Sequence, residues 1–384
     1  MQLIIKFLQI MGFWVQPYQK RSLVKPLLYI SLFMVSMVLP GIIFIVRQPP
    51  SFTIAVRTVV ETISIVNIII LVLSTVTHQQ WLEEAYIDLR FGFQARLRDS
   101  DFELREKIAE LGSSVDRYFK IYIKFQLGVV LTYISSNPIF TLTQYLRTGE
   151  LPPLHAILEA DFYLFDFTGN VWLWLLVIAF SAVALIIVVI VMVPINSLNW
   201  SLIKHAADLF KLVSRKAASL NELTDEKSRV EGLIDIVELH EVIYRSVRSL
   251  EKALNIYMLT QFGSFVIMVC LTLITLILVN DDRDLLLKMI LTLSFILSHI
   301  LMYSMLGTAL MSASASVSDA IYDVPWYQWS VSGQKNLLFV LRRSQRITAL
   351  TTGKFFYINR ATFGMALRTA GSYFTVLMQM YGAQ

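Results

Sequence analysis

Small and polar side chains recur on one face of the last apolar stretch of the chain, roughly 355–381. Thr362, Thr369, Ser372, Val376 and Gln379 follow spacings of seven, three, four and three residues, which is the periodicity of one helix face. A buried hydroxyl or amide costs free energy unless a neighbouring helix or water satisfies it. The stripe therefore predicts either a packing seam between helices or the lining of a water-filled path built from several copies of the helix.

The packing alternative has support of its own in the same stretch. Gly364, Ala366, Ala370 and Gly371 are small enough to let another helix approach closely. The pattern of residues by itself leaves both alternatives open.

No pattern in the chain is typical of catalysis or of a bound metal. Cys270 is the only cysteine, which excludes intrachain disulfides and thiolate clusters for zinc or redox chemistry. His240 and Glu241 are adjacent, but no second histidine follows at helical spacing, and the chain has neither a phosphate-binding glycine loop nor a nucleophile elbow. We expect no enzymatic activity, no cofactor, no metal and no nucleic-acid partner.

The elements that must position the stripe are membrane helices. The chain has 384 residues, of which 56% are hydrophobic and 16% are charged, whereas soluble domains carry about a quarter charged residues. Stretches of about twenty apolar residues predict seven transmembrane helices, at 26–46, 54–76, 119–140, 167–195, 257–279, 286–311 and 356–381. The fourth is too long for one crossing, so we expect its helix to continue into the following loop.

Positive charge orients these spans. Lys and Arg concentrate before span one and between spans two and three, four and five, and six and seven. The opposite side carries only Arg47, Arg57, Arg147, Arg283 and Lys288. The positive-inside rule then places the N-terminus in the cytoplasm, and seven crossings place the C-terminus outside. The predicted fold is all-α: a polytopic membrane protein whose charged, periodic stretches at 77–118 and 200–252 form long cytoplasmic helical extensions.

The most specific sequence motifs in the chain follow span six. They comprise 316–322, Trp326-Tyr327, 335–341, 343–345, 350–356 and 370–377. These motifs resemble the insect odorant receptor family, in its odour-tuning branch, and the likeness covers about residues 304–380 with weaker support from Gly12-Phe13-Trp14. One position departs from the family, since Ser304 stands where members often have a cysteine three residues before the glycine seen as Gly307.

The resemblance implies an odour-gated, non-selective cation channel at the plasma membrane of olfactory neuron dendrites. Tuning subunits of the family join a shared co-receptor in a heterotetramer. The resemblance also implies a split seventh helix, with a cytoplasmic anchor piece at about 334–350 followed by a pore-lining piece. The family's hydrophobic gate falls on Val376, and its next pore positions fall on Gln379 and Met380; Thr369 and Ser372 complete the predicted pore face. The chain thus divides into 1–315, 316–354 and 355–384.

A volatile ligand requires a small, closed, mostly apolar cavity with one or two polar groups. The resemblance places such a pocket in the outer half of the subunit, among spans two, three, four and six. The candidates, chosen by depth and side-chain character, are Thr62, Ile65, Tyr133, Asn137, Phe162, Phe167, Phe295, Ser298 and His299. Tyr133 and Ser298 are the best polar candidates, although each of the nine also fits simple core packing.

Two classes of function remain at this point. The first is a ligand-gated cation-channel subunit, with a gustatory-type receptor as the nearest neighbour. The second is an inverted seven-helix chemoreceptor or transporter-like protein without ion conduction of its own. The one glycosylation sequon, Asn199-Trp200-Ser201, falls at the cytoplasmic end of span four, so we expect it to stay unmodified.

Overall fold

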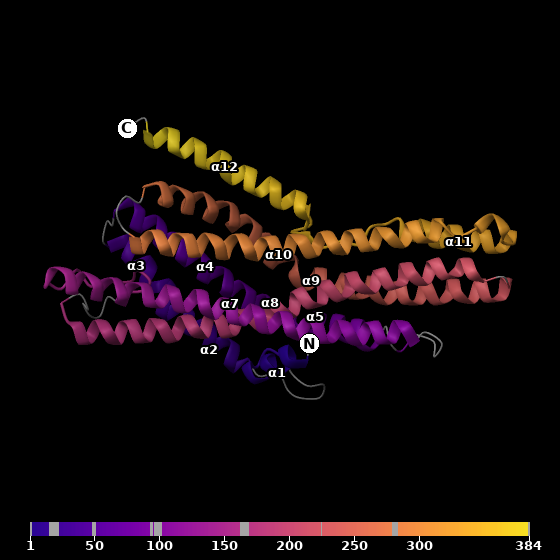
Figure 1. Ribbon diagram of the computed structural model, residues 1–384, viewed down its shortest axis with the longest axis horizontal. Helices are drawn as coiled ribbons and strands as arrows, with labels where there is room; N and C mark the ends of the chain where they lie inside the picture. Colours follow the sequence, from indigo (N-terminus) through magenta and orange to yellow (C-terminus); the bar gives the residue numbers. More distant parts are fainter. Residues whose placement is uncertain are drawn as a thin grey trace.

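The computed structural model describes residues 2–14, 23–47, 51–92, 95, 102–161, 169–223, 225–278 and 283–382. Within these ranges the chain is almost entirely helical, which confirms the all-α prediction. Long helices run along the length of an elongated bundle, with α11 at one end and the C-terminal end of α12 toward the other (Figure 1).

The first apolar span is one helix with a local irregularity. The elements of the N-terminal part are α1 (Gln2–Met11), α2 (Val24–Phe33), the π-helix η1 (Met34–Val38), α3 (Leu39–Arg47), α4 (Phe52–Thr77), α5 (Gln79–Ile87) and the π-helix η2 (Asp88–Gly92). The π-turn lies just before Pro40, whose missing N–H and bulky ring disfavour regular α-helical bonding to the preceding turn.

The remaining helices are much longer than a membrane is thick. They are α7 (Phe102–Thr148), α8 (Val171–Ala218), η3 (Ser219–Glu222), α9 (Glu226–Leu278), α10 (Arg283–Tyr322), η4 (Trp326–Gln328), α11 (Val331–Ser344) and α12 (Arg360–Gly382). Asn170 begins α8 by accepting hydrogen bonds from the N–H groups of Trp172 and Leu173, at 2.9 and 3.3 Å. As predicted, α8 continues past span four, and α9 returns beside it to form the extension.

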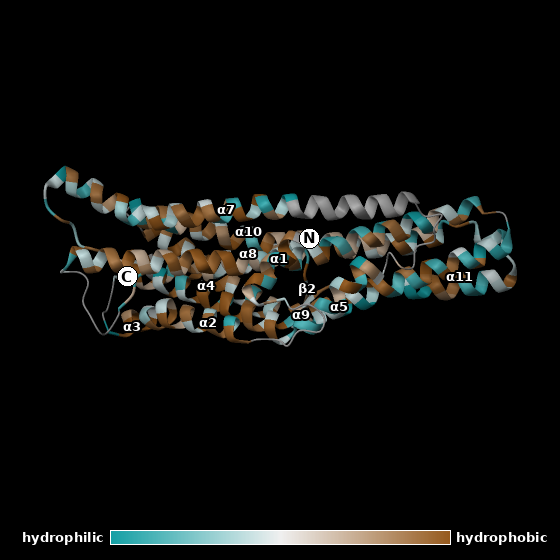
Figure 2. Cartoon of the chain, turned by 90° about the horizontal axis from the view of Figure 1, so that it is seen from below, coloured by the Kyte–Doolittle hydropathy of each residue, from teal (hydrophilic) through white to brown (hydrophobic). Residues whose placement is uncertain are grey.

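Five helical stretches in the described part of the chain are long and apolar enough to cross a membrane. They are Val24–Arg47, Phe52–Thr77, Val171–Glu222, Glu226–Leu278 and Arg283–Gln328. The less apolar α7 and α12 cover the positions of predicted spans three and seven. Hydrophobic residues dominate the half of the molecule that contains α2, α3 and α4, and hydrophilic residues become more frequent toward α11 (Figure 2).

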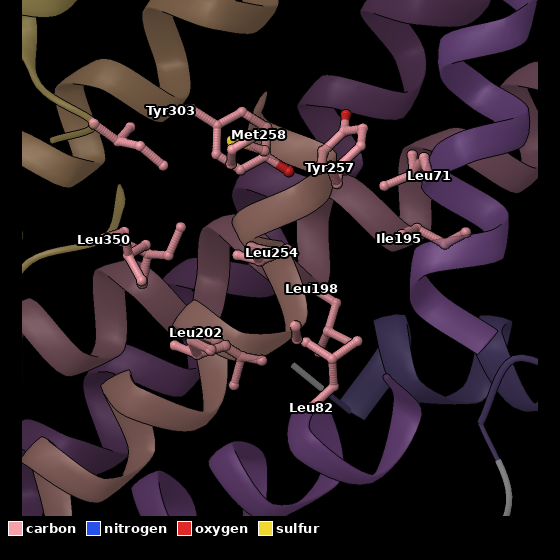
Figure 3. Packing of buried hydrophobic residues seen from close by; sticks show 14 of the residues in the cluster. Leu71, Leu82, Ile195, Leu198, Leu202, Leu254, Tyr257, Met258, Tyr303 and Leu350 are labelled. Atoms are coloured by element: carbon pink, nitrogen blue, oxygen red, sulfur yellow. The ribbon is translucent and has the colours of Figure 1, made fainter. Parts of the chain in front are cut away.

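The centre of the bundle is α8, which packs along α10 and also contacts α7 and α9. Every residue from 191 to 199 in α8 is buried, so this part of the helix has neighbours on all sides. Leu198 and Leu202 of α8 lie in one packed cluster with Tyr257 and Met258 of α9 and Tyr303 of α10 (Figure 3). A helix that is buried all round shows no hydrophobic stripe, which is why its sequence is apolar without a preferred face.

A short β-hairpin joins α11 to α12. Strand β1 (Thr351–Thr352) pairs antiparallel with β2 (Phe356–Tyr357), and Gly353 and Lys354 in the turn both have positive φ, at 59° and 63°. The last helix therefore begins at Arg360, five residues later than the apolar pattern predicts. Asn359 precedes it and accepts a hydrogen bond of 2.8 Å from the N–H of Thr362, as helix-capping side chains do.

The hairpin is held against both neighbouring helices. The N–H of Gly353 donates to the backbone carbonyl of Asn255, and the N–H of Lys354 donates to the Asn255 side-chain oxygen at 3.1 Å. On α10, Gly307 faces the hairpin so closely that a Cβ atom there would lie 2.0 Å from the carbonyl oxygen of Ile358. Glycine at 307 is thus a requirement of this close approach.

Candidate functional site

A small cavity lies between α4, α8, α9 and α10, near the centre of the bundle. Its lining residues are Ser64, Asn67, Ile68, Leu71, Met192, Asn196, Tyr257, Gln261, Met268, Phe295, Ile296 and His299. Its volume is about 20 Å³, which is room for about one water molecule. We call this space the central cavity; it is mostly apolar and carries a few polar groups.

The polar groups of the central cavity are arranged in pairs. The Gln261 amide Nε2 donates to His299 Nδ1 at 3.2 Å, and Asn67 Nδ2 donates to the Ser264 hydroxyl at 2.8 Å. If Nδ1 of His299 accepts, the neutral imidazole carries its proton on Nε2. Both His299 Nε2 and Gln261 Oε1 are buried without a hydrogen-bond partner. The cavity therefore offers one unused donor and one unused acceptor to whatever enters it.

Aromatic rings form the wall on the α10 side. Phe295 stacks on His299 with centroids 6.0 Å apart, and His299 meets Tyr303 edge-on at 5.4 Å. The Tyr303 hydroxyl donates to Asn196 Oδ1 at 2.9 Å. Of the sequence candidates on α10, Phe295 and His299 line the cavity, whereas Ser298 is exposed and donates to the Phe295 carbonyl of its own helix.

A second, smaller cavity lies nearer the N-terminal end of α4. It has a volume of about 10 Å³ and is lined by Met37, Gly41, Thr58, Glu61, Thr62, Ile65, Leu158 and Glu159. The sequence candidates Thr62 and Ile65 both belong to this second cavity, so the structure separates them from Phe295 and His299. Ser64, which lies between Thr62 and Ile65 in sequence, and Ile68 line the central cavity, so the two spaces lie along the same helix.

Charged side chains that were not among the predicted ligand residues surround the second cavity. Arg57 donates through Nε to Glu61 Oε1 at 2.7 Å, through Nη1 to Glu159 Oε1 at 3.3 Å, and through Nη2 to the Ile157 carbonyl at 2.8 Å. The hydroxyl of Tyr133, on α7, also donates to Glu61 Oε1. Tyr133 is thus part of a buried polar cluster rather than a wall of the central cavity.

The cluster extends to α10. Lys288 is fully buried, its ammonium lies 2.8 Å from Asp284 Oδ2, and it sits 5.6 Å from the centre of the Tyr133 ring. The sequence contained a signal for these groups, because Arg57/Glu61 and Asp284/Lys288 are opposite charges four residues apart in or beside apolar spans.

The segment 151–161 contributes Leu158 and Glu159 to the wall of the second cavity, and we call this segment the roof. Asn137 Nδ2 donates to the carbonyls of His155 and Ala156, at 3.0 and 2.6 Å, and Trp174 Nε1 donates to the same His155 carbonyl at 2.8 Å. The candidate Asn137 therefore fixes the roof instead of lining either cavity. The last two candidates, Phe162 and Phe167, lie outside the residues that the structure describes.

The two faces of α12 differ. Phe363 meets Phe265 of α9 with ring centroids 5.8 Å apart, and Ala366 and Ala370 are buried against the bundle. The predicted stripe points elsewhere: Val376 is 52% exposed and Met380 is 65% exposed. Ser372 and Gln379 are also exposed, and Thr369 is half-buried.

The hydroxyls on this helix are satisfied within it. Thr369 Oγ1 donates to the Met365 carbonyl at 2.9 Å, and Ser372 Oγ donates to the Arg368 carbonyl at 3.0 Å. Their lone pairs remain free to face water. Gly364 and Gly371 would meet no atom within 4 Å if they carried a Cβ, so the small residues that pack within this chain are the alanines.

The predicted anchor segment also has one face buried within the chain and one exposed face. Trp329 and Leu337 are buried within the chain, whereas Leu338 and Phe339 are 65% and 78% exposed. The sequon residue Asn199 is buried in α8, and its Nδ2 donates to the Tyr303 hydroxyl at 3.4 Å. A glycan could not be accommodated there on either side of a membrane, so the sequon carries no information about orientation.

Known proteins share both the sequence pattern and the fold. The model of the family described as 7tm Odorant receptor matches residues 51–371. Odorant receptor 22c of Drosophila melanogaster is 30% identical over 145 residues, and Odorant receptor 85b of the same organism is 29% identical over 159 residues. These alignments cover 38% and 41% of this chain but only 36% and 40% of the relatives' own lengths.

The likeness in structure extends over the whole chain. The solved structure of the insect olfactory receptor OR5 from Machilis hrabei, in complex with eugenol, superposes with a TM-score of 0.80 at 17% identity, covering 99% of this chain and 97% of that one. The fold and the long apolar helices define an all-α membrane protein. The chain belongs to the 7tm Odorant receptor family, because the family match covers most of its length.

Proposed function

We propose that this chain is an odorant-binding subunit of a ligand-gated, non-selective cation channel. The observation that carries the proposal is that the packed positions of α12 lie in its first half, whereas the second half, which carries the polar stripe, is largely exposed. The first half packs on α9 and α10 through Phe363, Ala366 and Ala370, whereas Ser372, Val376 and Gln379 in the second half are exposed among the residues that the structure describes. A stripe of this composition fits a wet pathway shared by several subunits.

The ligand site in this proposal is the central cavity. A volatile organic molecule needs a mostly apolar space with a few polar groups that fix its orientation. The unused donor at His299 Nε2 and the unused acceptor at Gln261 Oε1 supply these groups. Since the cavity has room for only about one water molecule, ligand entry must displace side chains, and the flexible Met192 and Met268 in its wall can yield. Eugenol, bound by the Machilis hrabei receptor, is a suitable first ligand to test.

Direct contacts connect the central cavity to the beginning of α12. Met268 lines the cavity, and Phe265, one turn away on α9, packs against Phe363 of α12. On α10, Thr308 accepts a hydrogen bond of 2.9 Å from the N–H of Arg360, the first residue of α12. Widening the cavity would therefore shift the two helices that carry α12. A ligand that binds the widened arrangement more tightly would shift the population toward it.

The apolar ring in this scheme is Val376. A constriction of valines can block ions by dewetting, and a wider ring admits water and then cations. Gln379 and Met380 follow on the exposed side of the helix. The remaining subunits would be co-receptor chains in a heterotetramer at the plasma membrane. The exposed apolar side chains of α11, Leu338 and Phe339, are suited to bind the neighbouring chain.

Current recording tests the proposal. In cells that express this chain with a co-receptor, an odorant panel including eugenol should evoke inward current within milliseconds, insensitive to G-protein block. Val376→Ser should raise the unliganded current or alter ion selectivity and leave the order of odour preferences unchanged, and Val376→Trp should reduce conductance. The matched control is Leu377→Ser, an exposed leucine on a different face of the same helix, which should leave the current as it was.

The co-receptor dilutes any effect of a single subunit, so the same substitutions are also made at its corresponding positions. The proposal fails if well-expressed channels keep their conductance, selectivity and basal current after all these changes. A chain that binds odorants but supports no current with or without a co-receptor would instead be a receptor without conduction of its own.

A further inference from the structure

The second cavity contains a carboxylate oxygen that nothing satisfies. Glu61 lines this cavity and is 8% exposed. Its Oε1 accepts from both Arg57 and Tyr133, but its Oε2 is buried without any hydrogen-bond partner. An unpaired buried carboxylate oxygen is costly. A ligand that brings donors to this oxygen would recover that cost.

The charges around Glu61 are also unequal. Among the residues that the structure describes, the ion pairs of the cluster join two cations, Arg57 and Lys288, with three carboxylates, Glu61, Glu159 and Asp284. One negative charge is therefore in excess when all five groups are ionised. His155, 3.9 Å from Glu159, lies at the exposed edge of the cluster. A bound cation would balance the charges in a part of the protein where an excess charge is expensive.

We propose that the second cavity binds the protonated amino group of a small alkylamine. The ammonium donates to Glu61 Oε2, and the Thr62 hydroxyl, also in the cavity wall, can accept a second hydrogen bond. The alkyl part lies toward Met37, Ile65 and Leu158, the apolar members of the lining. The site is separate from the central cavity and rests on the proposed receptor function only if its occupancy opens a channel.

An alkylamine fits these groups better than other ligand classes. A neutral alcohol brings a donor but no charge, so it leaves the excess negative charge in place. Within the described residues there is no group of three or more His, Cys, Asp or Glu side chains able to hold a metal ion. Charge-assisted hydrogen bonds are about twice as strong as neutral ones, which favours an ammonium over an isosteric hydroxyl at Glu61.

Access to the site passes the roof segment 151–161. The cavity has room for about one water molecule, so the roof or the Met37 side chain must move to admit an alkyl chain. Leu158 and Glu159 belong to both the roof and the lining. Their displacement would open the second cavity outward, toward the end of α4 at which Phe52 begins the helix.

Binding is measured on the purified full-length chain in detergent at neutral pH. The probes are butylamine and its isostere 1-butanol, and the readout is the unfolding midpoint as a function of probe concentration, which does not depend on conduction. Butylamine should raise the midpoint at concentrations where 1-butanol does not. Glu61→Gln keeps the shape but removes the charge, and should raise the butylamine concentration needed by about tenfold or more. Glu150→Gln, at an exposed carboxylate near the roof, is the control and should behave as wild type.

Equal stabilisation by butylamine and 1-butanol in the wild-type chain would overturn the proposal. So would an unchanged response to butylamine after Glu61→Gln. The comparison of the two probes needs only the wild-type chain, so it decides the matter even if Glu61→Gln fails to fold. Binding without any butylamine-evoked current would leave this site standing and would show only that its occupancy does not open the channel, whereas the channel proposal is decided by the odorant panel.

Discussion

Replacing Gly307 with alanine tests how tightly the hairpin fixes the start of α12. A Cβ atom at this position would lie 2.0 Å from the Ile358 carbonyl oxygen and 2.9 Å from its carbonyl carbon. These are backbone atoms, so no side-chain rotation can relieve the overlap. The Ile358 N–H donates to Leu350 at 2.9 Å, and the Arg360 N–H donates to Thr308 at 2.9 Å. The hairpin is therefore held from both sides and must move as a unit by about 1.4 Å or more, the difference between 2.0 Å and the 3.4 Å at which ordinary contact begins.

The expected cost follows from this overlap. Adding one methyl group to a well-packed site costs about 1–3 kcal/mol. We place Gly307→Ala near the upper end of that range, because the opposing atoms belong to a hydrogen-bonded hairpin. Gly263→Ala is the matched control: Gly263 lies within helix α9, is exposed, and would meet no atom within 4 Å. Alanine there should stabilise the chain by roughly 0.5–1 kcal/mol through helix propensity alone.

Thermal unfolding of the two purified variants measures the difference. Gly307→Ala should lower the unfolding midpoint by several degrees, and Gly263→Ala should leave it unchanged or raise it slightly. Because the hairpin leads directly into α12, Gly307→Ala should also change the basal or odour-evoked current. Equal midpoints for the two variants would refute the close contact between α10 and the hairpin.

Three further substitutions address the buried polar cluster at the second cavity, the roof segment and the anchor. Arg57→Leu should lower the free energy of unfolding by about 3–5 kcal/mol, because it leaves buried carboxylates unpaired, and a normal unfolding midpoint would contradict this. Asn137→Leu removes two hydrogen bonds to the roof and should cost about 2 kcal/mol while speeding proteolysis within 151–161; an unchanged cleavage rate would argue against the roof. Phe339→Ser should weaken co-purification with the co-receptor without lowering stability, whereas Leu337→Ser should destabilise the chain itself, and identical behaviour of the two would refute the division of the anchor into faces.

Helix content and helix length were readable from the sequence, because apolar runs and charged periodic stretches follow simple rules. The continuation of span four into α8 and the return through α9 are of this kind. The start of α12 was not readable from hydropathy. Phe355, Phe356 and Tyr357 are as apolar as a helix requires, but the positive φ values at Gly353 and Lys354 turn the chain into a hairpin first. The turn at Gly353 and Lys354 therefore sets where α12 begins.

The ligand candidates were predicted by depth and residue type, and these do not determine which direction a side chain takes. Phe295 and His299 are four residues apart and line the central cavity together. Ser298 lies between them in sequence and points outward, because one residue along a helix rotates the side chain by about 100°. Tyr133 and Asn137 are likewise four residues apart, yet both are engaged by polar partners outside the central cavity. Those partners come from α4 and from the roof segment, and the sequence of α7 alone does not predict them.

The same reasoning bears on the two alternatives that the stripe of α12 left open. A packing seam requires the small residues to meet a helix, and within this chain Ala366 and Ala370 do so. The stripe faces the other way, and its serine and threonine hydroxyls are satisfied by carbonyls of their own helix. Hydroxyls bonded in this manner need no partner helix, and a surface with Val376 among them is only weakly apolar. In the function that we propose, this face meets water shared among several copies of α12.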